Sequence, residues 1–157
     1  MTNYQLIVYN KSEGERMEDR YCASIEEVKL FLDTLKNILK DPKFNIDRDF
    51  DILLKKKNEE ISNSYTTMNT LLELEYGIED VIEELLTLEI YNYKETLIDN
   101  KGKNLPRFYV FIKEINGKDV YIKIKIRNIN NRKVFCISFH FAKYKFSKFP
   151  YKKGEKQ

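Results

Sequence analysis

Apolar and polar residues alternate with a period of two in the last third of the chain, a pattern typical of β-strands. The alternation predicts three strands, over 108–115, 118–127 and 133–141. Asn116-Gly117 separates the first two strands, and both residues tolerate the positive φ angles of a two-residue hairpin turn. Residues 128–132 are expected to form the next turn.

A helical pattern precedes these strands. Apolar residues over 28–39 follow helical spacing, and Ser24 and Glu27 stand just before them. These two residues match a capping box, in which the serine accepts from the Glu27 amide and the glutamate side chain reaches back. Asp41-Pro42 is expected to end this helix.

Two shorter helices are expected over 69–74 and 78–86. Gly77 stands between them and suits the C′ position of the first helix. Acidic residues near the start of the second helix complement its dipole.

The N-terminal part gives weaker signals. Residues 4–9 predict a short opening strand, and 11–20 are expected to form a loop. Residues 44–61 combine strand-like alternation with a highly charged run, and an irregular connection is expected near 58–65. The predicted fold class is therefore α+β. It consists of a small antiparallel sheet, of about three C-terminal strands and a possible N-terminal one, packed against short helices.

The strand pattern also predicts which residues share a face of this sheet. One set is apolar and is expected to meet the helices: Val120, Ile122, Ile124 and Ile126, with Phe135, Ile137, Phe139 and Phe141. The opposite side, which we call the second face, then collects Tyr121, Lys123, Lys125, Ser138 and His140. One face would be a core and the second face an exposed basic surface.

Charge is divided unevenly along the chain. Residues 94–157 contain 17 Lys and Arg against 5 Asp and Glu, whereas residues 1–93 contain 11 against 20. The net charge of +3 therefore conceals an acidic first part and a basic sheet. A clustered positive field attracts polyanions, so RNA or DNA is the first candidate partner.

Several functional classes are disfavoured by composition. The chain has no apolar run of about 18 residues and no signal-peptide pattern, so a cytoplasmic protein without a membrane span is expected. Cys22 and Cys136 suggest no disulfide framework. A single histidine without paired cysteines makes a zinc site improbable, and the 5 glycines form no phosphate-binding loop. We therefore expect neither a metal nor a cofactor.

The residues of the second face are suited to RNA cleavage without a metal. Such cleavage uses the substrate's own 2′-hydroxyl, and it needs a base, an acid and cations for the developing charge. Histidine can act as base or acid near neutral pH. Lysines can bind phosphates, and tyrosine rings can stack on unpaired bases.

Other interpretations fit the same pattern. A lone histidine at a strand end is more often structural than catalytic, and a lysine-rich strand face is usually solvated or protects an edge. The chain could therefore be a non-catalytic RNA-binding module, or an inhibitor that uses its basic sheet against an acidic partner. It could also be a protein-interaction domain with a partner surface made by Phe108, Tyr109 and the aromatic tail 144–151.

The order of several short motifs resembles a known family. They are Leu71-Leu72-Glu73-Leu74 with Gly77 and Asp80, Tyr93-Lys94, Phe111 with Lys113-Glu114-Ile115-Asn116-Gly117-Lys118, Val120-Tyr121-Ile122-Lys123, Val134 with Ile137-Ser138-Phe139-His140, and Phe149-Pro150-Tyr151. Residues 66–152 thus resemble the MqsR-type (motility quorum-sensing regulator) toxins of bacterial type II toxin–antitoxin systems. Residues 1–61 lie outside the match as an N-terminal extension, and 153–157 form a tail.

The resemblance implies a RelE-like fold and an endoribonuclease that cleaves mRNA and is neutralised by a cognate antitoxin. It implies an active site that contains Tyr93, Lys94, Tyr121 and His140. Some family members have a lysine in place of His140, so the assignment of acid and base stays open. Further candidate contacts to the RNA backbone are Arg107, Lys113, Lys123, Lys125 and Arg127.

Overall fold

The computed structural model describes residues 19–99, 101–102, 104–127 and 133–152. The strands are β1 (Asp19–Tyr21), β2 (Phe50–Ile52), β3 (Tyr93–Ile98), β4 (Phe108–Ile115), β5 (Lys118–Arg127) and β6 (Lys133–Phe141). The helices are α2 (Ile25–Lys40), α3 (Ile46–Asp49), α4 (Thr67–Leu74), α5 (Ile78–Leu86) and the short 3-10 helix η1 (Ile90–Asn92). The predicted strand at 4–9, the turn at 128–132 and the tail at 153–157 lie outside the described residues.

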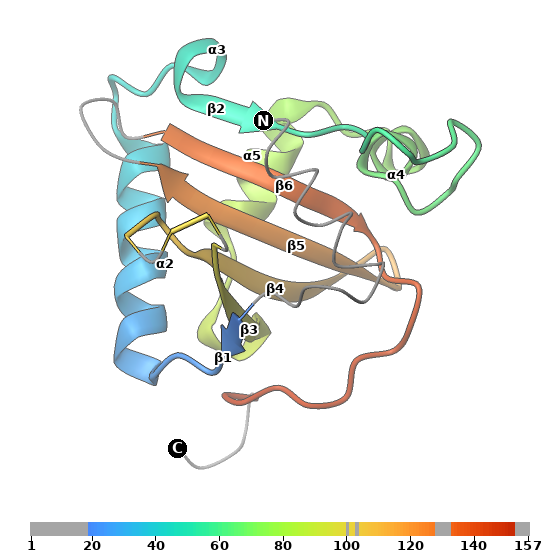
Figure 1. The fold of residues 1–157 in the computed structure, drawn as a ribbon. Coiled ribbons are helices and arrows are strands. Elements are labelled where there is room, and N and C mark those ends of the chain that lie inside the picture. Colours follow the sequence, from blue (N-terminus) through green and yellow to red (C-terminus); the bar gives the residue numbers. More distant parts are fainter. Residues whose placement is uncertain (1–18, 100, 103, 128–132, 153–157) are drawn as a thin grey trace.

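The fold is α+β, as predicted, but its sheet is larger than predicted. The described strands form one six-stranded mixed sheet with the order β1-β3-β4-β5-β6-β2. In Figure 1 the helix α5 lies behind β5 and β6, and α2 runs along one side of the sheet. Strands β4, β5 and β6 begin and end where the alternation predicts. Asn116 (φ 53°) and Gly117 (φ 82°) form the predicted hairpin turn.

The two edges of the sheet come from the N-terminal part of the described chain. Strand β1 pairs antiparallel with β3, and β2 pairs parallel with β6. Asp19 and Arg20 were expected in a loop and instead form β1 with Tyr21. The strands β1 and β2, which lie within the predicted extension 1–61, therefore belong to the same sheet as β3, β4, β5 and β6.

The long helix α2 begins as the sequence predicts. The Ser24 hydroxyl accepts a hydrogen bond from the Glu27 amide at 3.1 Å, and the helix ends at Lys40, before Asp41-Pro42. The Glu27 carboxylate does not close the predicted capping box. Its Oε2 instead accepts hydrogen bonds from the hydroxyls of Tyr21, at 2.7 Å, and Tyr109, at 2.6 Å.

The junction of α4 and α5 differs from the prediction. Glu75 has the left-handed conformation (φ 59°) that ends α4, and Gly77, at φ −94°, is the N-cap of α5. The Asp80 carboxylate accepts a hydrogen bond from the Gly77 amide at 2.9 Å. The glycine was expected at the end of the first helix and stands at the start of the second.

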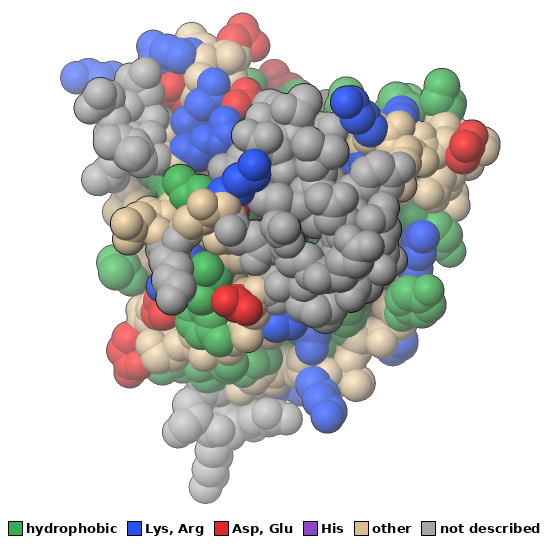
Figure 2. Space-filling view, viewed as in Figure 1, with side chains coloured by type: hydrophobic (Ala, Val, Ile, Leu, Met, Phe, Trp, Pro, Cys, Tyr) green, Lys and Arg blue, Asp and Glu red, His purple; other side chains and the backbone are tan. Residues whose placement is uncertain are grey.

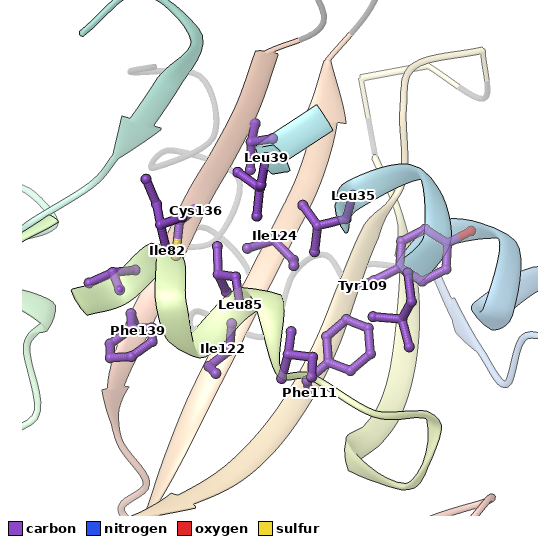
Figure 3. Close-up of a cluster of buried hydrophobic side chains, with 14 of the residues drawn as sticks. Leu35, Leu39, Ile82, Leu85, Tyr109, Phe111, Ile122, Ile124, Cys136 and Phe139 are labelled. Atoms are coloured by element: carbon purple, nitrogen blue, oxygen red, sulfur yellow. The ribbon is translucent and has the colours of Figure 1, made fainter. Parts of the chain in front are cut away.

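The main core lies between the helices and one face of the sheet (Figure 3). In this core Leu35 of α2, Leu85 of α5, and Ile122 and Ile124 of β5 are fully buried. Burial of each such side chain contributes about 1.5–3 kcal/mol. This core fixes the sheet against α2 and α5, and it leaves the second face on the other side.

A β-bulge divides strand β6. Lys123 of β5 pairs with Ser138, but the next residue, Ile124, pairs with Cys136. Ile137 is therefore an extra residue in β6, and the side-chain alternation of β6 changes phase there.

The bulge overturns the predicted faces of β6. Phe139 and Phe141 belong to the main core, whereas Phe135 and Ile137 belong to a second apolar cluster. The other buried members of this second cluster are Leu97, Phe108, Val110 and Ile112. The expectation of one apolar face and one basic face is therefore wrong, because both faces carry buried apolar residues.

Helix α4 covers the edge of β6 beyond the short strand β2. The Phe139 amide donates to the Thr67 hydroxyl at 3.1 Å, and the Phe141 amide donates to the Thr70 hydroxyl at 3.0 Å. These bonds satisfy backbone donors that a longer β2 would otherwise pair with. They hold in place the end of β6 that carries His140.

Candidate functional site

His140 and Tyr121 lie side by side on the second face. They are register partners on β6 and β5, and their rings stack with centroids 5.3 Å apart and planes 16° apart. Both side chains are partly exposed. The structure thus brings together two of the four residues predicted for the active site.

The surroundings of His140 favour its neutral form. Burial lowers the pKa of His140 below its usual value of 6.5 and outweighs the hydrogen bond to Phe141, which raises it. The nearby Lys56 and Lys143 lower this pKa further, and Glu59 raises it. The ring Nδ1 lies 3.0 Å from the Phe141 carbonyl oxygen. Because a carbonyl only accepts, Nδ1 carries the proton and Nε2 keeps a lone pair. His140 can therefore accept a proton through Nε2 at neutral pH.

A cavity of about 310 Å³ lies beside this pair, and we call it the His140 cavity. Its described lining includes the cations Arg20, Lys56, Lys123 and Lys143, with one carboxylate, Glu59. The aromatic lining residues are Tyr65, Tyr121, Tyr144, Phe146 and His140. Arg20 forms an ion pair of 2.9 Å with Glu95, but the three lysines still exceed the one carboxylate of the lining. An excess of cations together with aromatic rings suits an anionic ligand that carries flat groups.

Lys94 lies next to the cavity lining. Its Nζ donates to the Lys148 carbonyl oxygen at 2.9 Å and stands 6.0 Å from the centroid of the Phe146 ring. The centroid of the Phe146 ring also lies 6.1 Å from the centroid of the Tyr121 ring. Phe146 therefore contacts both side chains, and Lys94 borders the His140 cavity across it.

Tyr93 is placed apart from the other predicted site residues. It is fully buried in the main core, where its ring meets Phe111 edge-on. Its hydroxyl accepts from the Ala23 amide at 2.8 Å, and its ring stacks on Tyr151 at 5.9 Å. The Tyr151 hydroxyl in turn donates to the Ala23 carbonyl at 2.6 Å. In this position Tyr93 helps to anchor the aromatic tail 144–151 through Tyr151.

The two lysines predicted to contact RNA on β5 are buried. Lys123 is 5% exposed and lines the His140 cavity. Lys125 is 0% exposed, with its Nζ 3.4 Å from the Asp99 carboxylate and 4.2 Å from the centroid of the Phe108 ring. The ammonium group of Lys125, which was predicted to contact the RNA backbone, is therefore enclosed between Asp99 and the Phe108 ring.

Three further predicted contacts lie outside the lining of the cavity. Arg107 donates to the Tyr21 hydroxyl, and Lys113 forms an ion pair of 2.6 Å with Glu84 of α5. Arg127 pairs with Asp51 of β2 at 3.3 Å. Arg107 and Arg127 therefore lie beside the edge strands β1 and β2, and Lys113 lies against helix α5.

Sequence reasoning missed several lining residues of the cavity. Arg20 belongs to β1, which was expected to be a loop, and Lys56 and Tyr65 belong to the irregular connection after β2. Lys143 and Tyr144 follow β6 after Ala142, and Tyr144 was predicted only as part of the aromatic tail of a protein-interaction domain. The alternation of lysine and aromatic residues over 143–146 was the available signal for this part of the site.

The positive charge on the face seen in Figure 2 is scattered over its described part. Figure 2 shows Lys and Arg side chains at several separate places on the described part of this face, with no single continuous patch.

In the described residues, no group of three or more His, Cys, Asp or Glu side chains could hold a metal ion. Within the same residues, no helix is long and apolar enough to cross a membrane.

Comparison of the chain with models of protein families, with curated proteins and with solved structures finds no match in any of the three.

Proposed function

We propose that this protein is an endoribonuclease that cleaves mRNA without a metal ion. The observation that carries the proposal is the His140–Tyr121 pair beside a cavity lined by four cations and several aromatic rings. The cations suit the phosphates of RNA, and the rings suit its unpaired bases. The neutral histidine supplies a base in the same place.

In the proposed reaction, His140 Nε2 takes the proton of the RNA 2′-hydroxyl. The 2′-oxygen then attacks the adjacent phosphorus, the bond from phosphorus to the 5′-oxygen breaks, and a 2′,3′-cyclic phosphate forms. The leaving 5′-oxygen takes a proton from water. Lys94, whose Nζ lies across the Phe146 ring from the cavity, would add positive charge that stabilises the transition state. General bases of this kind contribute about 10²–10⁴ in rate.

The other side chains would hold the substrate. Tyr121 stacks on His140 and would position the scissile phosphate through its hydroxyl. Lys123 lines the cavity and would stabilise the charge that develops on the phosphate. Tyr93 would act indirectly, since it is buried and its ring supports Tyr151 in the aromatic tail 144–151, which also contains Phe146.

The proposal extends to the biological setting that the sequence resemblance implies. The protein would be an MqsR-type toxin with a RelE-like arrangement of its sheet, act in the cytoplasm and be neutralised by a cognate antitoxin protein. It would need no organic cofactor. Growth arrest on expression, relieved by the protein encoded beside it, is the expected cellular behaviour.

The direct test is incubation of the purified protein with a mixed-sequence RNA in EDTA. His140→Gln is the informative variant, because glutamine can still donate to the Phe141 carbonyl but cannot act as a base. We expect discrete cuts with cyclic-phosphate ends for the wild type and a loss of at least about 100-fold for the variant. Lys94→Ala should also lower the rate of cleavage. Lys29→Ala, which removes an exposed lysine of α2, is its matched control and should leave the rate unchanged.

Equal cleavage by His140→Gln and wild type would contradict the assignment of the base. If the RNA is retarded on a gel but never cut, the protein is a non-catalytic RNA-binding module and not an enzyme.

A further inference from the structure

A ridge of exposed side chains borders the His140 cavity. It consists of Tyr65, Lys143 and Tyr144, and with Ala142 these residues also line a second cavity of about 370 Å³. The second cavity adjoins the β4–β5 hairpin at Gly117. The ridge therefore separates two adjoining hollows of the surface.

The ridge presents aromatic rings to solvent. Tyr144 is 77% exposed, the highest value among the exposed large hydrophobic residues described, and Tyr65 is 38% exposed, the lowest value in that group. The ammonium group of Lys143 lies 5.7 Å from the centroid of the Tyr65 ring. Exposed rings of this size serve no core, since burial is what makes them stabilising.

An exposed ring next to a cation is suited to an unpaired nucleotide. The base can stack on the ring, while the cation meets the phosphate that follows it. Two rings at the rim of a cationic cavity would hold a strand whose phosphate enters that cavity. Paired bases are stacked within a duplex and cannot lie on such a ring.

We infer that the ridge of Tyr65, Lys143 and Tyr144 binds a nucleotide adjacent to the scissile phosphate and restricts the protein to single-stranded RNA. This inference rests on the proposed function, which places the scissile phosphate in the His140 cavity. It adds a binding subsite and a substrate class to that function.

The test measures binding separately from cleavage. The probe is a fluorescently labelled eight-nucleotide RNA with 2′-O-methyl groups, which cannot be cut because the attacking hydroxyl is blocked. Binding by the full chain is followed by fluorescence anisotropy at low salt. We expect Tyr144→Ala to weaken binding about tenfold, because stacking is worth about 1–3 kcal/mol per base.

Two controls isolate the stacking. Tyr144→Phe keeps the ring and should bind within about twofold of the wild type. Leu72→Ala removes a 68% exposed apolar side chain from α4 and should change nothing. The same probe annealed to its complement should bind the wild type more weakly and be indifferent to Tyr144→Ala.

The outcomes separate this inference from the proposed function. Equal binding by Tyr144→Ala and wild type would contradict nucleotide binding by the ridge. Uncut RNA in the cleavage assay would contradict the proposed endoribonuclease activity. A tenfold loss with Tyr144→Ala supports the ridge even if no RNA is cut. Failure of the wild type to bind the probe at all overturns the ridge and points to a protein partner for these rings.

Discussion

The carboxylate of Glu27 connects helix α2 to two strands, and we expect its bond to Tyr109 to be measurable as a coupling energy. Glu27 Oε2 accepts from Tyr109 at 2.6 Å and from Tyr21 at 2.7 Å. The Tyr109 ring is 9% exposed and stacks on Phe31 at 3.9 Å. The hydroxyl therefore points from a packed ring onto a charged acceptor.

The expected magnitude follows from this geometry. A hydrogen bond to a charged group contributes about 1.5–3 kcal/mol, and Tyr109→Phe removes one while Tyr21 still donates to the same oxygen. We expect a loss near the lower end, about 1.5–2 kcal/mol. For a chain of this size each kcal/mol lowers Tm by about 2–4 °C.

The assay is a double-mutant cycle measured by urea unfolding. Glu27→Ala removes the acceptor and adds its own costs at the helix start, but these cancel in the cycle. Once Glu27 is absent, Tyr109→Phe should cost little more. Tyr144→Phe, at an exposed ring, is the control and should change the free energy of unfolding by less than about 0.5 kcal/mol. Losses that add within about 0.5 kcal/mol would refute the coupling.

Three further predictions concern packing, the hairpin and pH. Leu85→Ala, at a fully buried position of α5, should lower the free energy of unfolding by about 2–5 kcal/mol in urea, whereas a loss below 1 kcal/mol would contradict the described core. Gly117→Ala should cost about 1 kcal/mol in the same assay, because its φ of +82° disfavours alanine although no atom lies within 4 Å of the added carbon. Because the pKa of His140 is lowered in the folded protein, the unfolded chain binds this proton first as the pH falls. The contribution of His140 to stability should therefore be full above pH 6.5 and decrease below it. Between pH 7 and pH 5 the urea midpoint should change less steeply with pH in His140→Gln than in the wild type.

A fourth prediction extends to alkaline pH. Burial raises the pKa of Tyr76 and of Tyr151 to about 12, from the usual 10. The unfolded chain therefore loses these protons first, and stability should be full below pH 10 and fall as the pH rises from 10 toward 12. A tyrosine absorbance titration should show delayed ionisation in the folded protein, and simultaneous ionisation of all tyrosines near pH 10 without unfolding would contradict it.

Local signals predicted the elements whose cause is local. The alternation over 108–141 and the Asn116-Gly117 pair defined the central hairpin, and Ser24 marked the start of α2. In each case the deciding residues lie within a few positions of one another. Strand β3 was missed because its residues, Tyr93–Ile98, form a sheet only when β1 and β4 lie on both sides.

The candidate site depended on features that alternation does not reveal. The bulge at Ile137 arises from pairing with β5, so a strict period of two placed Phe135 on the wrong face. The pattern did predict that Tyr121 and His140 share a face, whereas their direct pairing across β5 and β6 is known only from the register of the strands. The burial of Lys125 depends on Asp99, a residue 26 positions away in the sequence.

The strand order has a consequence for synthesis of the protein. The ribosome makes β1, α2 and β2 first, but the strands that they border, β3 and β6, are made later. Helix α2 packs on α5 and η1, and its Phe31 stacks on Tyr109 of β4, so its apolar side is fully covered only after β4 is made. Strand β2 can pair only after Val134–Cys136 of β6 have left the ribosome. Such non-local pairing slows folding and prolongs the exposure of unpaired strand edges. The nascent chain should consequently depend on chaperones until its last strand is complete, and the proposed active site, which needs β6, should form only at the end of synthesis.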